Sequence, residues 1–250
     1  GYDACYENPQ FRLGNANPTE YGGGCNKTEA QGNAIYIIDA QTGKRLWWAS
    51  SSGANINNSN MKHSIVSRIS TLDRDADGLV DHLYVGDLGG QVWRVDLNNN
   101  LASDSIADFA THVVKLLNLH ATDGTSPRFY EAPNFSVYGY GANTLAVVSI
   151  AAGNRSLPVS DVTTIGAIYN IFDRDVTKTS LYSLSASQLS STVSTLGNGG
   201  LVDLSNISNL TASNLPTYGW YQKLTTGYKV MGEMAVLNKS LYASIYNPSG

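Results

Sequence analysis

Apolar and polar residues alternate along most of the chain in short runs, which Gly, Asp and Asn separate. Few segments carry the period of a helix, so the pattern predicts strands joined by turns. One expected hairpin pairs residues 34–39 (AIYIID) with residues 45–49 (RLWWA) across the turn AQTGK. A second pairs residues 82–86 with residues 91–97 across the turn DLGG.

Later apolar runs predict further strands at residues 113–119, 128–132, 144–151, 165–172, 220–224, 230–237 and 240–246. Residues 183–216 are rich in Ser, Asn, Leu and Thr without a clear period. We expect a long connection there, with a short helix near residues 187–196 that ends at Gly197.

The two N-terminal hairpins resemble each other, because each has a strand, a turn with Gly and a strand that contains Trp. Repeated antiparallel hairpins with periodic Gly and aromatic residues are typical of β-propellers, in which four-stranded blades surround an axis. We therefore expect an all-β fold, a modified β-propeller whose ring need not close within this chain. A β-sandwich is the alternative.

Composition narrows the classes of partner. Charged residues make up 14% of the 250 residues, the net charge is −4, and Lys and Arg are scattered. This argues against nucleic acid or an anionic membrane surface as a partner. No apolar run reaches the length of about 18 residues that a membrane span needs. The 15 tyrosines, with abundant Asn, Ser, Thr and Gly, are typical of a secreted or cell-surface β protein.

The two cysteines, Cys5 and Cys25, enclose a segment rich in Asn, Gly and Pro that cannot form much core. A disulfide between them would staple this segment, and a free pair is the alternative. The four histidines show no zinc-ligand spacing with either cysteine. We expect residues 1–31 to form a loop-rich, disulfide-stapled segment of the same domain, and residues 32–250 to form the propeller blades.

Four aspartates fall within nine residues, directly ahead of an apolar run. Asp73, Asp75 and Asp77 match positions 1, 3 and 5 of an EF-hand-type loop, and Gly78 takes the sharp turn at position 6. Carboxylates held this close repel one another, and each resists ionisation unless a cation lies between them. The alternation therefore indicates a cation site, with an Asp-rich surface turn as the alternative.

The rest of the loop departs from the EF-hand pattern. Leu79 offers its backbone carbonyl at position 7, but Tyr84 occupies position 12, where an EF-hand has a bidentate Glu. Asp81, at position 9, is the natural replacement for that carboxylate, and the flanking segments are expected strands. An all-oxygen ligand set suits a hard cation such as Ca²⁺. The sequence thus predicts a calcium loop on a β-hairpin, with ligands from Asp73, Asp75, Asp77, Leu79 and Asp81.

Several motifs together resemble one family. They are GNAIYIIDAQTGKRLWW, DRDADGLVDHLYVGDLGGQVWRVDL, RFYEAPNFSV, AAGNRSLP, and YGWYQKL followed by KVMGEMAVLNKSLYASIYNP. In this order, from about residue 32 to the end, they resemble the C-terminal β-propeller domain of PilY-type proteins, the tip-associated factors of type IV pili. The resemblance implies that the acidic loop is the calcium site and that the chain is a portion of a longer domain.

The resemblance also implies a function. In that family, calcium loading is linked to the balance between pilus extension and retraction, and the tip position is linked to adhesion and twitching motility. The implied cofactor is Ca²⁺, and the implied partners are minor pilins, the pilus tip complex, and a host or abiotic surface. The implied location is the cell surface at the pilus tip, outer-membrane associated or periplasmic in transit.

Two other classes stay open. The hairpin LYVGDLGGQVWRVDL also resembles quinoprotein dehydrogenases, which are calcium-dependent propeller enzymes with a Trp floor under the cofactor. A secreted carbohydrate-binding propeller would use exposed Tyr and Trp. No catalytic constellation is visible, so we expect no enzyme, and we interpret Asp173 and Asp175 as parts of a solvated turn. The four tryptophans are interpreted as blade-packing residues: Trp47, Trp48, Trp93 and Trp220.

Overall fold

The computed structural model describes residues 29–98, 109–121, 125–140, 143–207, 211 and 214–250. In this part of the chain the regular elements are strands and three short 3-10 turns, without an α-helix. No helix among these residues is long and apolar enough to cross a membrane. The strands form five separate sheets, none of which closes on itself. The prediction of an all-β chain is confirmed.

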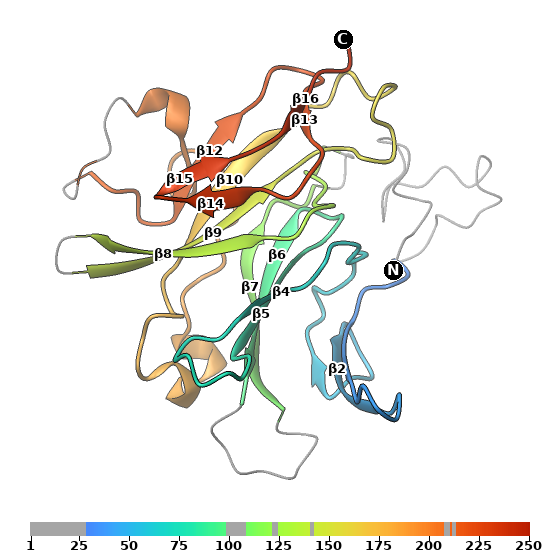
Figure 1. Cartoon of the computed structure of the whole chain (residues 1–250), viewed down its shortest axis with the longest axis vertical. Coiled ribbons are helices and arrows are strands. Elements are labelled where there is room, and N and C mark those ends of the chain that lie inside the picture. Colours follow the sequence, from blue (N-terminus) through green and yellow to red (C-terminus); the bar gives the residue numbers. More distant parts are fainter. Residues whose placement is uncertain (1–28, 99–108, 122–124, 141–142, 208–210, 212–213) are drawn as a thin grey trace.

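Three larger sheets carry most of the strands (Figure 1). The three-stranded sheet comprises β1 (Ile35–Ile38), β2 (Arg45–Ser50) and β3 (Ile56–Asn57). The four-stranded sheet has the order β4 (Ser70–Leu72), β5 (His82–Gly86), β6 (Gln91–Leu97) and β7 (Ala110–Asn118). The five-stranded sheet has the order β11 (Val202–Asp203), β12 (Gly219–Lys223), β10 (Ala167–Asp173), β9 (Asn143–Ala151) and β8 (Asn134–Tyr140).

Two small pairs complete the strands. They are β13 (Lys229–Val230) with β16 (Ile245–Tyr246), and β14 (Ala235–Leu237) with β15 (Ser240–Tyr242). The 3-10 turns are Leu181–Ser183, Ala186–Gln188 and Leu204–Asn206.

The middle of the four-stranded sheet is covered on both faces, because every residue of β5 and β6 is buried. Side chains alternate between the faces of a strand, so neighbouring residues belong to different cores. Val85 and Trp93 pack with residues of β1 and β2. Tyr84 and Val92 pack instead with residues of β9 and β10. The four-stranded sheet therefore lies between the other two large sheets.

The face of the four-stranded sheet toward β10 also carries charge. Strand pairing places Asp96 of β6 between His82 of β5 and His112 of β7. The Asp96 carboxylate lies 2.8 Å from His82 Nδ1 and 3.0 Å from His112 Nδ1. It also accepts two hydrogen bonds from Arg94, at 2.7 Å from Nε and 3.0 Å from Nη2. Burial alone would raise the pKa of Asp96, but the two histidines and the arginine outweigh burial and hold that pKa well below its usual range.

Arg94 carries this ionic network across to the five-stranded sheet. Its Nη1 donates to Asp173 Oδ1 of β10 at 2.5 Å, and the Tyr84 hydroxyl donates to Asp173 Oδ2 at 3.1 Å. The side chains of Arg94, Asp96 and Asp173 have no exposed surface. We name Arg94, Asp96, Asp173, His82 and His112 the inter-sheet ionic network. One guanidinium thus joins the carboxylates of two sheets.

The interpretation of Asp173 and Asp175 as a solvated turn is wrong. Asp173 is 3% exposed and Asp175 is 1% exposed. Asp175 accepts hydrogen bonds from Lys178 Nζ at 2.6 Å and from the Ser190 backbone N–H at 2.8 Å. Both carboxylates can be buried because hydrogen-bond partners satisfy them, among them Arg94 and Ser190 from other segments.

Most of the predicted strands are present, and the two N-terminal hairpins are confirmed. No strand forms at residues 128–132, because the backbone there bonds to two different elements: the Phe129 N–H reaches the Asp87 carbonyl and the Arg128 carbonyl accepts from Gly153. The expected helix near residues 187–196 is reduced to the 3-10 turn Ala186–Gln188. Strand β8 was not predicted.

Cys5 and Cys25 lie outside the described residues, as does most of the segment 1–31. The disulfide and the loop-rich character of that segment therefore stay predictions.

Removing the central arginine should be costly. Arg94→Leu would leave two buried carboxylates without their cation, so we expect a loss of about 3–5 kcal/mol in the free energy of unfolding, measured with urea. The matched control is Arg68→Leu, since Arg68 pairs with Glu233 at 2.8 Å on the surface, and that pair should contribute less than about 1 kcal/mol. Equal losses in the two variants would contradict a central role for Arg94.

The same network makes stability depend on pH. The hydrogen bond to Asp96 raises the pKa of His112 above 6.5. The folded protein therefore keeps a proton that the unfolded chain loses, so this stabilisation is complete below about pH 6.5 and is lost as the pH rises through the folded pKa. We expect His112→Gln to lower the pH dependence of the unfolding free energy above pH 6.5, measured by urea unfolding in EDTA. Burial raises the pKa of Asp87 to about 7. Asp87 titrates in the wild type and in His112→Gln alike, so the difference between their slopes of unfolding free energy against pH reports on His112. Identical slopes would contradict the assignment.

Candidate metal centre

The acidic loop, residues 73–81, connects β4 to β5. These strands pair antiparallel with Leu72 opposite His82, so the loop is the tip of a hairpin, as the sequence predicts. The backbone of Asp81 continues the sheet on both sides: its N–H donates to the Leu72 carbonyl at 2.8 Å, and its carbonyl accepts from Leu97 at 2.7 Å. Asp81 is thus held in the sheet, whereas Asp75 is exposed at the tip.

Three of the four loop carboxylates converge. Oxygens of Asp73, Asp75 and Asp81 all lie within 4.8 Å of one another. Oxygen ligands of Ca²⁺ lie 2.3–2.6 Å from the ion, so ligands on opposite sides of one ion are about 4.6–5.2 Å apart. The observed spacing is compatible with one shared cation, and the donors are carboxylate oxygens, which suit a hard ion. The residues present therefore fit a metal ion.

The loop backbone holds the first carboxylate in place. Asp73 accepts from the Ala76 N–H at 2.7 Å through Oδ1 and from the Gly78 N–H at 2.9 Å through Oδ2. Gly78 has φ +91°, and a Cβ there would meet no atom within 4 Å. Gly78 is therefore needed for its backbone conformation and not for space. Ala76 has φ 63°, a left-handed conformation that an L residue adopts at a cost of about 1–2 kcal/mol.

Two predicted ligands are not in this group. The Asp77 carboxylate lies outside it, and its Oδ1 accepts from the Leu79 N–H at 2.8 Å. The Leu79 side chain is 52% exposed. Asp77 and the Leu79 carbonyl therefore remain predicted ligands, while Asp73, Asp75 and Asp81 form the acidic group.

Sequence reasoning missed the side chains that connect the loop to the rest of the protein. The Arg74 backbone N–H donates to Asp81 Oδ2 at 2.7 Å, and its guanidinium Nη2 donates to the Lys178 carbonyl at 3.2 Å. The same guanidinium lies 5.8 Å from the centre of the Tyr182 ring. The Tyr182 ring in turn stacks on His82, with 6.1 Å between centroids and 8° between planes. No local pattern pairs residue 74 with residue 182, so only the fold reveals this contact.

The acidic loop affects the ionisation of Tyr182. Burial and the nearby charge of Asp81 raise the pKa of Tyr182 to about 12. Its hydroxyl and His82 Nε2 are buried atoms without a hydrogen-bond partner among the described residues. The segment from Lys178 to Leu184 therefore lies against both the acidic loop and the inter-sheet ionic network.

Comparison with known proteins gives a likeness in fold. No family model matches the chain, and no curated protein matches it. Among solved structures, the chain is similar to the crystal structure of the Pseudomonas aeruginosa PilY1 C-terminal domain, with a TM-score of 0.58 and 19% identity. The match covers 88% of this chain and 52% of that one, so the chain spans about half the length of the solved domain. At this level of identity the comparison shows that the chain shares the fold of that domain over most of its length.

Proposed function

We propose that the chain is the calcium-binding β-propeller portion of a type IV pilus tip-associated protein, and that it is not an enzyme. The observation that carries the proposal is the likeness in fold to the PilY1 C-terminal domain. The acidic group of Asp73, Asp75 and Asp81 supports the calcium part of the proposal. The ordered motifs from residue 32 onward support the same family independently of the fold.

In this proposal the large sheets are blades. A four-stranded antiparallel sheet that neighbouring sheets cover on both faces is the packing expected of one blade between two others. The four-stranded sheet has this arrangement, with β1 and β2 on one face and β9 and β10 on the other. The three-stranded and five-stranded sheets would then be adjacent blades of an open arc (Figure 1).

Calcium would bind where the three carboxylates converge. Without a cation these groups repel one another, whereas Ca²⁺ accepts six to eight oxygen ligands in flexible geometry. Asp77 and the Leu79 carbonyl would complete the ligand set with water. A cation that binds only the folded loop stabilises it by RT ln(1 + [Ca²⁺]/Kd).

Arg74 would transmit the state of the loop. Its N–H is bonded to Asp81, and its guanidinium contacts both the Lys178 carbonyl and the Tyr182 ring. Movement of the loop around a cation would therefore reach the 3-10 turn Leu181–Ser183. The next residue, Leu184, accepts a hydrogen bond from His112 Nε2 at 2.7 Å. Loop closure and the inter-sheet ionic network thus meet at one segment.

The proposed biological role follows from the resemblance. At the pilus tip, calcium would shift the balance between extension and retraction, and the exposed surface would contact minor pilins and a host or abiotic surface. Calcium would act only through its different affinities for the open and closed loop.

Trp47 and Trp93 are fully buried, which favours a packing role for them over a cofactor floor of the dehydrogenase type.

The calcium site is testable by calorimetry on the purified protein. Asp75→Asn removes an exposed charge from the acidic group, so folding should persist while Ca²⁺ affinity falls at least about tenfold. The matched control is Asp39→Asn, because Asp39 is a partly exposed turn aspartate that accepts hydrogen bonds from the backbone N–H groups of Gln41 and Thr42. Asp77→Asn should cause a smaller loss than Asp75→Asn. An unchanged Ca²⁺ affinity in Asp75→Asn would contradict the assignment of the acidic group as a calcium site.

The biological role is testable in cells that make the full-length protein. Asp75→Asn should alter surface piliation or twitching motility while the amount of the protein at the surface stays unchanged, and Asp39→Asn should behave as wild type. Normal piliation and motility in a variant that has lost Ca²⁺ binding would overturn the regulatory role and leave a structural site. Dye-linked alcohol oxidation by the purified protein with added quinone would favour the dehydrogenase class instead.

A further inference from the structure

A cavity of about 340 Å³ lies where the end of the four-stranded sheet meets the five-stranded sheet. Residues 119–120 and 125–128 after β7, residues 152–154 after β9, the approach to β10, and β12 contribute to its walls. Its volume falls in the range of small-molecule sites, about 300–1,000 Å³. None of its lining residues belongs to the acidic loop.

One end of the cavity is polar and buried. Arg128 is 4% exposed, and its Nη1 donates to Asn154 Oδ1 at 3.3 Å. Asn154 in turn donates from Nδ2 to Asp161 Oδ2 at 2.9 Å. Lys229, 1% exposed, donates from Nζ to the carbonyls of Asp161 and Gly227. This end of the cavity is therefore lined by buried polar groups that are hydrogen-bonded to one another.

The charged groups among the described residues that line the cavity are mostly basic. They are the side chains of Arg128, Lys223 and Lys229, with one carboxylate, that of Asp161. Burial alone would raise the pKa of Asp161, but hydrogen bonds from Thr164 and Asn154 outweigh it and lower that pKa. Asp161 is thus ionised and already bonded within the wall. The described lining residues therefore carry more positive than negative charge in a chain whose net charge is −4, which favours an anion.

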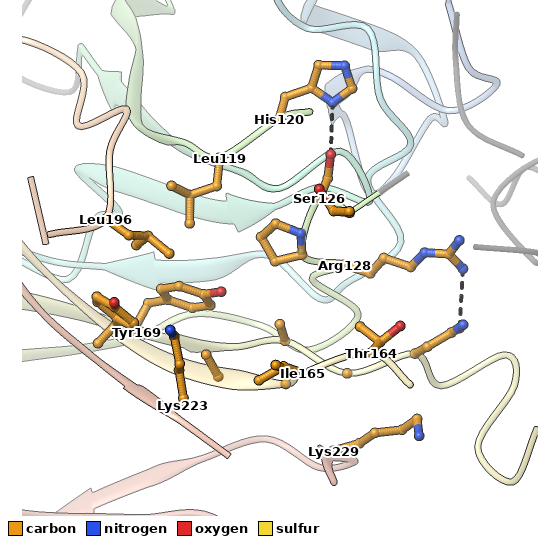
Figure 2. Close-up of a pocket in the computed structure, with 18 of the residues that line it drawn as sticks. Leu119, His120, Ser126, Arg128, Thr164, Ile165, Tyr169, Leu196, Lys223 and Lys229 are labelled. Carbon is orange, nitrogen blue, oxygen red and sulfur yellow. Dashed lines mark hydrogen bonds between the residues drawn. The ribbon is translucent and has the colours of Figure 1, made fainter. Parts of the chain in front are cut away.

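The other end is apolar and open. Figure 2 shows Leu119, Leu196 and Tyr169 at this end, with Lys223 beside them and Ile165 between the two ends. Ile165 is 51% exposed and Leu196 is 41% exposed. Lys223 is exposed, and its Nζ lies 5.9 Å from the centre of the Tyr221 ring. Lys223 forms no ion pair within 4 Å with the described residues. Its charge is close enough to contribute to the lowered pKa of Asp203.

We propose that this cavity binds a small carboxylate with an apolar body. The body would contact Leu119, Ile165 and Leu196, and the carboxylate would pair with the ammonium of Lys223. The buried cations at the polar end would add a positive potential that rejects amines. A short fatty acid and the C-terminus of a peptide that ends in an apolar residue share this chemistry.

The proposal is tested by titrating the whole chain with hexanoate and with hexylamine, following backbone amide shifts by NMR. Hexanoate should bind at about millimolar affinity, with shifts at Gly166 and Tyr169, and hexylamine should bind at least about tenfold more weakly. Lys223→Gln should weaken hexanoate binding about fivefold, and Lys44→Gln, at an exposed lysine outside the cavity, should not.

A second variant keeps the test independent of one lysine. Ile165→Glu places a carboxylate beside the apolar end and should abolish hexanoate binding, whereas Val159→Glu, at a residue 60% exposed and outside the cavity, should leave it unchanged. The tripeptide Gly-Gly-Leu in the same titration distinguishes a peptide terminus from a free acid. Absence of binding by both hexanoate and the tripeptide, or equal binding of hexanoate and hexylamine, would overturn the proposal.

Discussion

The structure depends on one buried guanidinium. Arg94 lies between Asp96 of its own strand and Asp173 of the neighbouring sheet, and these side chains have no exposed surface. Burying three charges is unfavourable unless each finds its partners in good geometry. Only one strand register provides them, because the pairing that sets His82 opposite Asp96 also sets Tyr84 opposite Arg94. A slip by one residue would turn these charges into the apolar core around Trp47 and Trp93.

The same register positions the acidic loop. His82 begins β5 and belongs to the inter-sheet ionic network, and Asp81 precedes it directly. The network therefore fixes the point at which the loop enters the sheet. The exposed carboxylates of Asp73 and Asp75 depend instead on the turn around Ala76 and Gly78. One loop thus combines a carboxylate anchored in the sheet with carboxylates positioned by local backbone geometry.

Features that depend on neighbouring residues could be predicted from the sequence. The hairpin β5–β6 follows from apolar runs joined by DLGG, and the acidic group follows from the spacing of its aspartates. Residues 128–132 have a strand-like composition, but their backbone bonds to two separate elements, which no local pattern encodes. Asp173 resembles a surface residue in the sequence, but Arg94 and Tyr84 reach its carboxylate from another sheet and allow it to be buried. The contact of Arg74 with Tyr182 and the cavity near Lys223 arise from long-range packing, so the sequence alone does not predict them.

Under the proposed function, the different anchoring of the loop aspartates would favour a regulatory over a purely structural cation site. A ligand shifts a conformational equilibrium only by its difference in affinity between the two states. Asp81 is held by ladder hydrogen bonds to Leu72 and Leu97, so it offers nearly the same carboxylate in either state. In that proposal the difference would come from Asp73 and Asp75, because like-charge repulsion between their carboxylates and that of Asp81 would be relieved by a cation. Arg74 lies between these two aspartates in the chain, and its side chain contacts the Lys178–Leu184 segment. Closure of the loop around a cation would therefore be coupled by a direct contact to a segment that the ionic network also holds.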